Sequence, residues 1–527
     1  MNQRHAWIAV LLILAAGVAA RSRGLAERTL SFDEAFSWRL VNVYSAPGIV
    51  ERTAADVHPP FYYLLLELWT HAFGESAVAL RSLSVLLAGA SLPLVYVLAR
   101  DGFRWAGGAP DEDSAPAAGV IATLLVATSG AHIRWSGEAR MYSLACLLGL
   151  ASTWLLARGV LDPSRSRRGS AALWGLYALT ACLSLYTHNY MIFVIAAQDL
   201  WLLLYAPAPV EEEEGAGVAW RRRRAGLAAL AVACAAYAPW IPVLHRQADQ
   251  VRQGYWFGRT GPYGMAQSWA DLIAPRNQLY WGEDWAAATV VGLSLVIVAW
   301  LGLSGRRIGA LLAAMIAMAT LVPVAMTLYW FPVVNNQTNR YWLVPFIFFV
   351  VGVSIMLCRT LGGAERWLFA GVLVANNVYW AAEFSRETRL DLMGGAKAAV
   401  EYIQAHGDPD ESIVVREPDV YLRLLYYLRN DPARERLYFL PNGDVAHYNG
   451  GPLISEREMS EDAILVPWRG RKVWAVDGAT LLVSLDNARL LEPWEPAGPS
   501  QVFAEPIRAY GKVVVTESVY VEPAGQK

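Results

Sequence analysis

Lysine is absent from the chain before residue 397. The four lysines (Lys397, Lys472, Lys512 and Lys527) all lie in the C-terminal part, so a phosphate handled elsewhere in the protein must be met by arginine. The formal net charge is -2, and no basic tract occurs beyond Arg221 to Arg224. A chain with this charge pattern has no electrostatic footprint for nucleic acid, and that class of partner is excluded.

Cysteine is also scarce. The four cysteines fall inside apolar runs, and none lies in the C-terminal part (Cys146, Cys182, Cys234 and Cys358). No disulfide framework is therefore predicted, even if the C-terminal part is extracytoplasmic. That part also lacks a Gly-rich phosphate loop, a nucleophile elbow and metal-spaced His or Cys residues, so acceptor binding or assembly is a better prediction for it than catalysis.

Charged residues make up only 17% of the 527 residues, while 55% are hydrophobic and 22 are tryptophan. This composition is typical of a membrane protein with aromatic residues at its interfaces. Apolar runs long enough to cross a bilayer recur up to about residue 384, and the sequence beyond is mixed and polar. We therefore predict a polytopic all-α membrane domain over residues 1–384 and a separate domain over 385–527.

About eleven transmembrane helices are predicted, at 7–24, 82–100, 115–131, 141–157, 171–187, 190–206, 225–241, 286–303, 308–330, 341–358 and 366–384. The first run ends in small residues and has an alternative interpretation as a cleaved signal peptide, but a retained helix is favoured. A cytoplasmic N-terminus places the arginines near 100–104, 158–168, 221–224, 306–307 and 359–366 inside. An odd number of spans then makes the domain after 385 extracytoplasmic.

Two longer outer loops are expected, at 25–81 and 242–285. Within the first, the apolar stretch 61–73 is too short to cross a bilayer and is predicted to be an interfacial helix. In the C-terminal domain, helices at 397–405 and 420–428 and strands at 412–415, 472–476 and 512–521 predict a small α/β fold.

Acidic residues cluster just after the first apolar segment. Asp33 and Glu34 are candidate catalytic groups, although a solvated acidic pair or a helix cap is an equally simple interpretation. Asp56 and His58 stand directly before Pro59-Pro60, where Asp56 could instead cap the following helix. A divalent metal at Asp56 and His58 would need further carboxylate ligands, because no second histidine has ligand spacing.

Further polar residues lie at other predicted outer boundaries. Glu138, Arg140 and Tyr142 precede the fourth span, where Glu138 has either a functional role or a structural pairing with a nearby arginine. Arg340 and Tyr341 open the tenth span and could offer a guanidinium fork to a phosphate, or could simply anchor the helix. The segment Tyr186-Thr187-His188-Asn189-Tyr190 forms another short polar connection between two predicted spans on the outer side.

These groups suit one type of reaction. A hydroxyl that attacks a sugar carried on a lipid phosphate needs a carboxylate base near the bilayer surface and cations near the departing phosphate. Asp33 and Arg340 could supply them. A phosphate is a good leaving group, so no acid catalyst is required.

Four motifs stand out in the membrane part: Ser31-Phe32-Asp33-Glu34, Asp56-Val57-His58-Pro59-Pro60-Phe61, Gly74-Glu75 with Arg81, and Glu138-Ala139-Arg140-Met141-Tyr142-Ser143-Leu144. Together they resemble the GT-C membrane glycosyltransferases, in the branch of bacterial relatives of protein O-mannosyltransferases and lipid A aminoarabinose transferases. The resemblance covers roughly residues 1–384 and is weaker in the C-terminal part.

The resemblance implies polyprenyl-phosphate sugar donors, Asp33 as the catalytic acidic residue with Glu34 beside it, and Glu138 as a second acidic position near the donor. The sequence departs from the aminoarabinose transferases at Pro59-Pro60, since the lysine expected near the phosphate is absent. Arg340, Tyr341, Arg140, Arg246 and Arg252 are therefore our candidates for binding the phosphate. Tyr142, His188, Asp56 and His58 are candidates for the substrate cleft.

The function expected is an inverting glycosyltransferase of the inner or plasma membrane. It would move a sugar from a polyprenyl phosphate to a protein, lipid or glycan hydroxyl on the outer face. A transporter or flippase of a lipid-linked substrate is the main alternative, and a sensor or assembly protein that acts through its C-terminal domain is a third. Acids at the outer boundary, rather than at mid-span, favour the transferase.

Overall fold

The computed structural model describes residues 2–107, 114–162, 167–204, 216–254, 260–273, 284–334, 339–390, 395–408, 411–440, 450–454, 472–479, 494–504 and 512–520. The chain forms two compact units. Unit 1 comprises residues up to 23, His58–Leu65 and Arg81–Phe384. Unit 2 comprises Gly24–Val57, Leu66–Leu80 and the chain from Ser385. The outer segment before residue 81 is thus divided, and much of it belongs with the C-terminal part.

Unit 1 is helical. Its elements are α1 (Gln3–Ser22), the start of α4 (Phe61–Phe73), most of α5 (Ala77–Trp105), α6 (Ser114–Thr128), α7 (Gly130–Ser136), α8 (Tyr142–Leu161), α9 (Arg167–Leu185), α10 (Met191–Leu204), α11 (Ala216–Tyr237), η1 (Ala238–Trp240), α12 (Ile241–Gln253), α13 (Pro262–Ile273), α14 (Asp284–Leu303), α15 (Arg307–Tyr329), η2 (Asn339–Trp342), α16 (Leu343–Thr360) and α17 (Gly363–Leu390). Helix α4 covers the range predicted for the interfacial helix.

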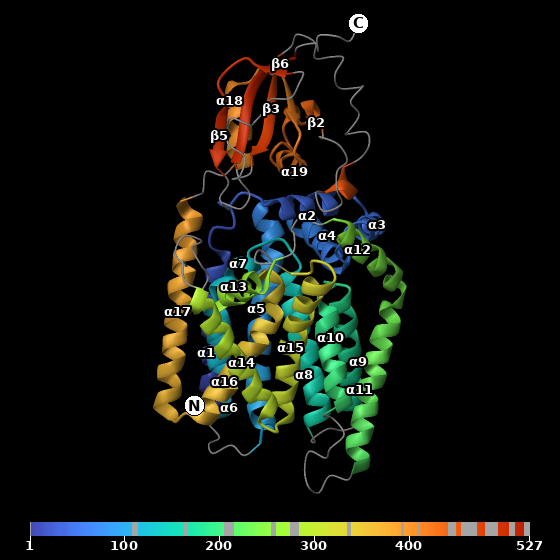
Figure 1. The fold of residues 1–527 in the computed structure, drawn as a ribbon, viewed down its shortest axis with the longest axis vertical. Helices are drawn as coiled ribbons and strands as arrows, with labels where there is room; N and C mark the ends of the chain where they lie inside the picture. The colour runs from blue at the N-terminus through green and yellow to red at the C-terminus, as the bar shows by residue number, and fades with distance from the viewer. Residues whose placement is uncertain are drawn as a thin grey trace. The chain divides into compact units, whose positions relative to one another are not determined.

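The long helices of unit 1 run alongside one another (Figure 1). Helix α16 lies at the centre of this packing, because it contacts α6, α8, α14 and α15. Helix α10 packs on α15, while α9 packs on both α8 and α11. The 18-residue apolar window that includes α16 is 94% buried, compared with 22% for α1, so α16 belongs to the interior and α1 to the periphery.

Each of the eleven predicted segments coincides with a helix of the structure, so their helical nature is confirmed. Among the described residues, six helices are long and apolar enough to cross a membrane, or seven if α6 and α7 count as one bent span. Shorter apolar helices occupy Ser170–Leu185, Met191–Leu204 and Ala287–Leu303. These helices indicate a multi-pass membrane protein, while eleven crossings and a cytoplasmic N-terminus stay predictions.

The third predicted span is broken. Helix α6 ends at Thr128, and α7 leaves it at an angle of 60° after Ser129, whose hydroxyl oxygen accepts the backbone N–H of His132. The buried Arg21 of α1 donates to the carbonyls of Val126 and Ala127 at 3.1 and 3.0 Å. The Val126 carbonyl also accepts the backbone N–H of Ser129 at 3.4 Å, so Arg21 supplies additional donors to the carbonyls at the break.

The second predicted outer loop contains helices. Its described residues form α12 and α13, while 255–259 and 274–283 lie outside the described residues. Helix α13 packs on η2 and α14. Its Trp269 ring lies 5.7 Å from Trp342, and its indole donates to the Ser294 hydroxyl at 3.0 Å. Helix α13 thus supports the short turn that carries Arg340.

Unit 2 combines helices from the outer segment with a mixed sheet. The outer segment contributes α2 (Phe32–Val43), α3 (Ala46–Ala55) and the end of α4. The C-terminal part contributes α18 (Gly395–His406), β1 (Ser412–Val415), α19 (Pro418–Tyr427), η3 (Pro432–Arg436), β2 (Leu437–Phe439), η5 (Gly451–Leu453), β3 (Lys472–Ala479), β4 (Trp494–Pro496), β5 (Gln501–Ala504) and β6 (Lys512–Tyr520). The predicted small α/β fold is confirmed.

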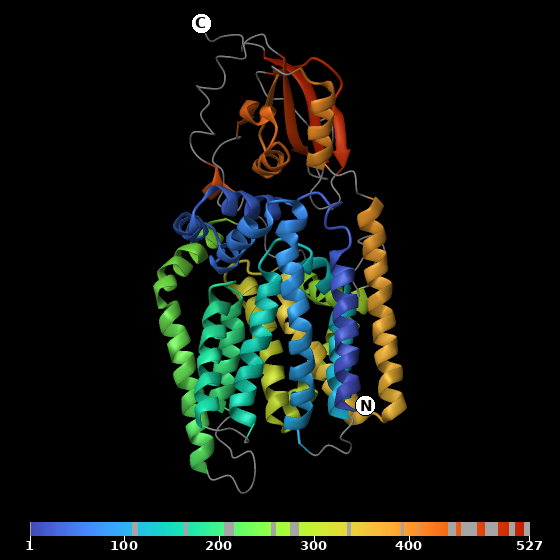
Figure 2. The same cartoon turned by 180° about the vertical axis from the view of Figure 1, so that it is seen from behind.

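The sheet has the order β2-β1-β3-β6-β4, with β5 also paired to β6. Strand β1 is parallel to β2 and β3, whereas β6 is antiparallel to its neighbours. Helix α18 contacts β5 and β6, and α19 contacts β1, β2 and β3. Figure 2 shows α18 running along the strands. The Val-rich strands β1 and β6 are buried because helices cover them.

Gly450 is a position of unit 2 where a side chain is poorly tolerated. Its φ is +83°, and an added Cβ would meet a Leu422 side-chain atom at 2.9 Å. Gly450→Ala is expected to destabilise unit 2 by about 1–2 kcal/mol through left-handed backbone strain. Thermal unfolding of the full-length protein in detergent measures the loss. Gly175→Ala in α9, where an added Cβ meets nothing within 4 Å, is the control, and equal midpoints for both variants would contradict the prediction.

Candidate functional site

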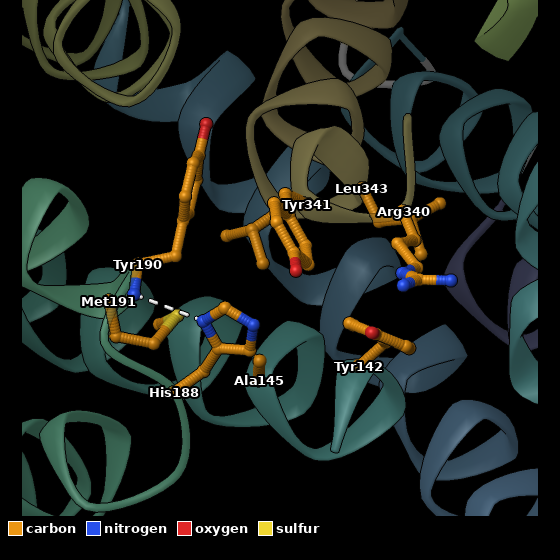
Figure 3. Close-up of a pocket in the computed structure, with 9 residues that line it drawn as sticks. Tyr142, Ala145, His188, Tyr190, Met191, Arg340, Tyr341 and Leu343 are labelled. Atoms are coloured by element: carbon orange, nitrogen blue, oxygen red, sulfur yellow. Dashed lines mark hydrogen bonds between the residues drawn. The ribbon is translucent and has the colours of Figure 1, made fainter. Parts of the chain in front are cut away.

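A small pocket in unit 1 brings together four of the polar residues predicted at the outer boundaries, namely Tyr142, His188, Arg340 and Tyr341. It is lined by Tyr142, Ala145, His188, Tyr190, Met191, Arg340, Tyr341, Leu343 and Val344. These residues come from the starts of α8, α10 and α16 and from the turns that precede them. Figure 3 shows the rings of Tyr142, His188 and Tyr341 and the Arg340 guanidinium around the same space.

His188 is held by the tight turn between α9 and α10. Its Nδ1 accepts the backbone N–H of Tyr190 at 3.0 Å (Figure 3), so Nε2 carries the proton in the neutral ring. The side chain is 7% exposed, and Nε2 has no hydrogen-bond partner among the described residues. A buried N–H donor without a partner is costly, and it therefore marks a place for a ligand oxygen.

Arg340 is buried among aromatic rings. Its guanidinium carbon lies 5.4 Å from the centre of the Trp135 ring and 5.8 Å from those of Tyr142 and Tyr341. Such cation–π contacts hold the plane of the guanidinium at the edge of the pocket.

Arg140 provides a second buried guanidinium. It donates to the Tyr63 hydroxyl at 2.8 Å, and its own carbonyl accepts the Ser84 hydroxyl at 3.2 Å. Ser84 in turn lies 3.0 Å from the Tyr62 hydroxyl. Residues of α4 and α5 thus fix both the backbone and the side chain of Arg140.

His58 joins the same cluster. Its ring centre is 5.5 Å from that of His188, and its Nδ1 also lacks a partner among the described residues. Burial and then the charge of Arg140 lower the pKa of His58 well below its usual range. Burial, followed by the charges of Arg140 and Arg340, lowers the pKa of His188 to about 3. Both rings are neutral at pH 7, and the two arginines create a positive potential around them.

The low pKa of His188 predicts a loss of stability in acid. Its folded-state pKa lies below the ordinary value of 6.5, so the unfolded state binds more protons at lower pH. The contribution is complete above pH 6.5 and is lost as the pH falls toward 3. Going from pH 7 to pH 5 should cost about 2 kcal/mol from this residue alone.

The midpoint of thermal unfolding at pH 7 and pH 5 checks this acid sensitivity. His188→Gln should lose part of the pH dependence, whereas His71→Gln, at an exposed ring, should keep all of it. An unchanged pH dependence in His188→Gln would show that the ring is not held neutral.

Asp33 and Glu34 belong to unit 2 and open helix α2. Ser31 is the N-cap: its hydroxyl oxygen accepts the N–H of Glu34 at 3.3 Å, and Glu34 Oε2 accepts the N–H of Ser31 at 3.0 Å. Glu34 is 2% exposed and thus has a capping role at the helix start. Asp33, partly exposed in the first turn, is the acid of this pair that the capping box does not use.

The remaining predicted residues are spread over both units. Asp56 is buried in unit 2 and ends α3 as its C-cap, so it does not open the helix at Phe61. Glu138 is buried in unit 1 just before Arg140. Arg246 and Arg252 are exposed on α12, where Arg252 pairs with Asp249 at 3.2 Å. They are not among the residues that line the pocket.

The metal site predicted at Asp56 and His58 would need further ligands, and the described residues do not supply them. Within them, no three His, Cys, Asp or Glu side chains form a group that could hold a metal ion. The metal at His58 and Asp56 stays a prediction from sequence.

Tyr63 and Tyr190 were missed as candidate site residues. Tyr63 lies in an aromatic, apolar helix, and the sequence alone predicts only a packing role for a tyrosine in such a helix. Tyr190 ends the short polar connection that contains His188, and its hydroxyl donates to the Ala319 carbonyl in α15. Its position two residues after His188 in the sequence could have marked Tyr190 as a candidate.

No family model matches the sequence, and no curated protein matches it. Solved structures do resemble the fold. ArnT from Cupriavidus metallidurans bound to undecaprenyl phosphate has a TM-score of 0.58 at 14% identity, over 96% of this chain and 97% of that chain. The apo structure of the same protein also has a TM-score of 0.58, at 15% identity over 98% of each chain.

The apo oligosaccharyltransferase of Archaeoglobus fulgidus is less similar, with a TM-score of 0.46 and 11% identity over 90% of this chain and 70% of that chain. The likeness to ArnT extends over nearly the whole length of both chains, including the C-terminal part. The chain therefore has the ArnT-like GT-C fold that its motifs predict.

Proposed function

We propose that the protein is an integral membrane glycosyltransferase that moves a sugar from a polyprenyl phosphate to an acceptor hydroxyl. The observation that carries the proposal is the buried His188 N–H donor, which faces a pocket shared with the Arg340 guanidinium. A pocket of this kind suits a phosphate. Support comes from the fold, because the similar ArnT structure was solved with undecaprenyl phosphate bound.

The donor phosphate would be bound by Arg340, Arg140 and His188. The guanidinium groups would supply charge and several N–H donors, and the neutral His188 ring would supply one more donor at Nε2. Tyr341 and Tyr142 flank the Arg340 guanidinium and would keep its plane in place. Arg246 and Arg252 on α12 form a second proposed location for the phosphate, and mutation of each arginine decides between the two.

Asp33 is the proposed general base. The acceptor oxygen forms a bond to the anomeric carbon of the sugar while the bond from that carbon to the phosphate oxygen breaks. Asp33 takes the proton of the acceptor hydroxyl, and polyprenyl phosphate leaves with both bonding electrons. A single displacement inverts the configuration of the anomeric carbon. Glu138 is proposed as a second acidic group near the sugar.

The proposed orientation has a cytoplasmic N-terminus and catalysis at the outer face of the inner or plasma membrane. The positive-inside distribution of arginine supports it. A donor on a lipid phosphate also suits a site reached from the bilayer, because the polyprenyl chain stays in hydrocarbon while its phosphate is at the surface.

Reconstituted vesicles test the proposal. Purified protein is mixed with polyprenyl-phosphate hexoses and pentoses and with a hydroxyl-bearing extract of envelope lipids and proteins. The release of free polyprenyl phosphate and the anomeric configuration of the product are measured. Sugar transfer with inversion is expected. Movement of the intact lipid across the bilayer, without cleavage of the bond from sugar to phosphate, would instead establish a flippase.

A further inference from the structure

Glu75 is a motif residue that the proposed chemistry leaves without a role. It lies in unit 2, just after α4, and its side chain is 38% exposed. Its Oε2 accepts the indole N–H of Trp38 at 2.8 Å, and its Oε1 lies 3.2 Å from Nε of Arg429. One carboxylate thus contacts the helix that carries Asp33 and the segment that follows α19.

Tyr426 contacts both Trp38 and Arg429 and so completes a closed cycle of contacts with Glu75. The rings of Trp38 and Tyr426 meet edge to face with their centres 5.3 Å apart. The Arg429 guanidinium lies 4.1 Å above the centre of the Tyr426 ring and donates to the Tyr426 carbonyl at 2.7 Å. The four side chains therefore contact one another in sequence, from Trp38 to Glu75 to Arg429 to Tyr426 and back.

Other contacts join the same two parts of unit 2. The Leu30 N–H, just before the N-cap of α2, donates to the Tyr427 hydroxyl at 2.7 Å. Further along α2, Arg39 donates to the Leu453 carbonyl at 2.9 Å. The C-terminal domain therefore contacts helix α2 just before its start and in its middle. A helix of 12 residues is marginal alone and depends on such packing.

We propose that Glu75 is a positioning residue that fixes helix α2, and with it Asp33, to the C-terminal domain. The inference rests on the proposed function, because it takes Asp33 as the base. It gives the C-terminal domain a role in catalysis without placing a catalytic residue there. Displacement of a positioned base by about 1 Å can cost up to about 100-fold in rate. Loss of the contacts that Glu75 makes with Trp38 and Arg429 should therefore reduce turnover.

The test compares Glu75→Ala, Glu75→Gln and the control Glu67→Gln in the full-length protein in nanodiscs. Glu67 is an acid within α4, in the part of that helix that belongs to unit 2. Amide hydrogen exchange of residues 33–43 reports the stability of α2 whether or not the protein is a transferase. Turnover and the affinity for polyprenyl phosphate are measured on the same samples.

Glu75→Ala is expected to speed exchange in α2 by about tenfold and to lower turnover roughly tenfold at unchanged affinity for polyprenyl phosphate. Glu75→Gln should be intermediate, since its amide oxygen still accepts the Trp38 indole. Unchanged exchange in Glu75→Ala would overturn the inference, as would faster exchange with full turnover. A wild-type protein that transfers no sugar would instead overturn the proposed function, and the catalytic role of Glu75 with it.

Discussion

Asp33→Asn should reduce turnover by roughly 10²–10⁴-fold, the usual contribution of a general base. The amide keeps the size and shape of the carboxylate but cannot accept the proton of the acceptor hydroxyl. The helix start should survive, because Ser31 and Glu34 form the capping box and only the favourable charge at the N-terminus of α2 is lost. Affinity for polyprenyl phosphate should stay at the wild-type value.

Initial rates of sugar transfer, together with titration of polyprenyl phosphate, measure both effects. Glu51→Gln is the matched control, because Glu51 is an exposed acid on α3 in the same outer segment. Full turnover in Asp33→Asn would reject Asp33 as the base. Equal losses in Asp33→Asn and Glu51→Gln would mean that the negative charge of the segment, and not one positioned carboxylate, matters.

Arg340→Lys should weaken the binding of polyprenyl phosphate by about 10- to 100-fold. Lysine keeps the positive charge but loses the planar fork and its stacking on Trp135, Tyr142 and Tyr341. Because the phosphate is bound both before and during the reaction, the loss should appear in donor affinity more than in turnover at saturating donor.

Arg246→Lys and Arg252→Lys are the comparison for this prediction. Both arginines are exposed on α12, and the sequence offers them as alternative phosphate ligands. Wild-type affinity in these two variants, with a loss in Arg340→Lys, would place the phosphate with Arg340. Wild-type affinity in Arg340→Lys would assign that residue to anchoring of α16 instead.

Local apolar patterning was enough to predict the helices of the membrane part. Each run of hydrophobic residues from 7–24 to 366–384 became a helix, because burial in hydrocarbon requires every backbone polar group to bond within its own segment. The break between α6 and α7 was not predicted. At the break, Arg21 donates to the Val126 carbonyl, which lies 105 residues later in the sequence. A contact at this separation leaves no local pattern.

The candidate site was partly predictable for the same reason. His58, Arg140, His188 and Arg340 each lie at a predicted outer boundary, so their meeting in unit 1 follows from the ends of neighbouring helices. The association of the outer segment with the C-terminal domain was not predictable. The bond from Leu30 to Tyr427 and that from Arg39 to Leu453 join residues about 400 positions apart. The local sequence around either residue of such a pair does not indicate which distant residue it contacts.

The binding site of the phosphate can be located in a density map of the protein in nanodiscs with polyprenyl phosphate. We expect phosphate density within hydrogen-bonding distance of His188 Nε2 and of the Arg340 guanidinium. Density beside Arg246 or Arg252, or a headgroup held at mid-span among the helices, would contradict this expectation. The mid-span position would favour a transporter of lipid-linked substrates.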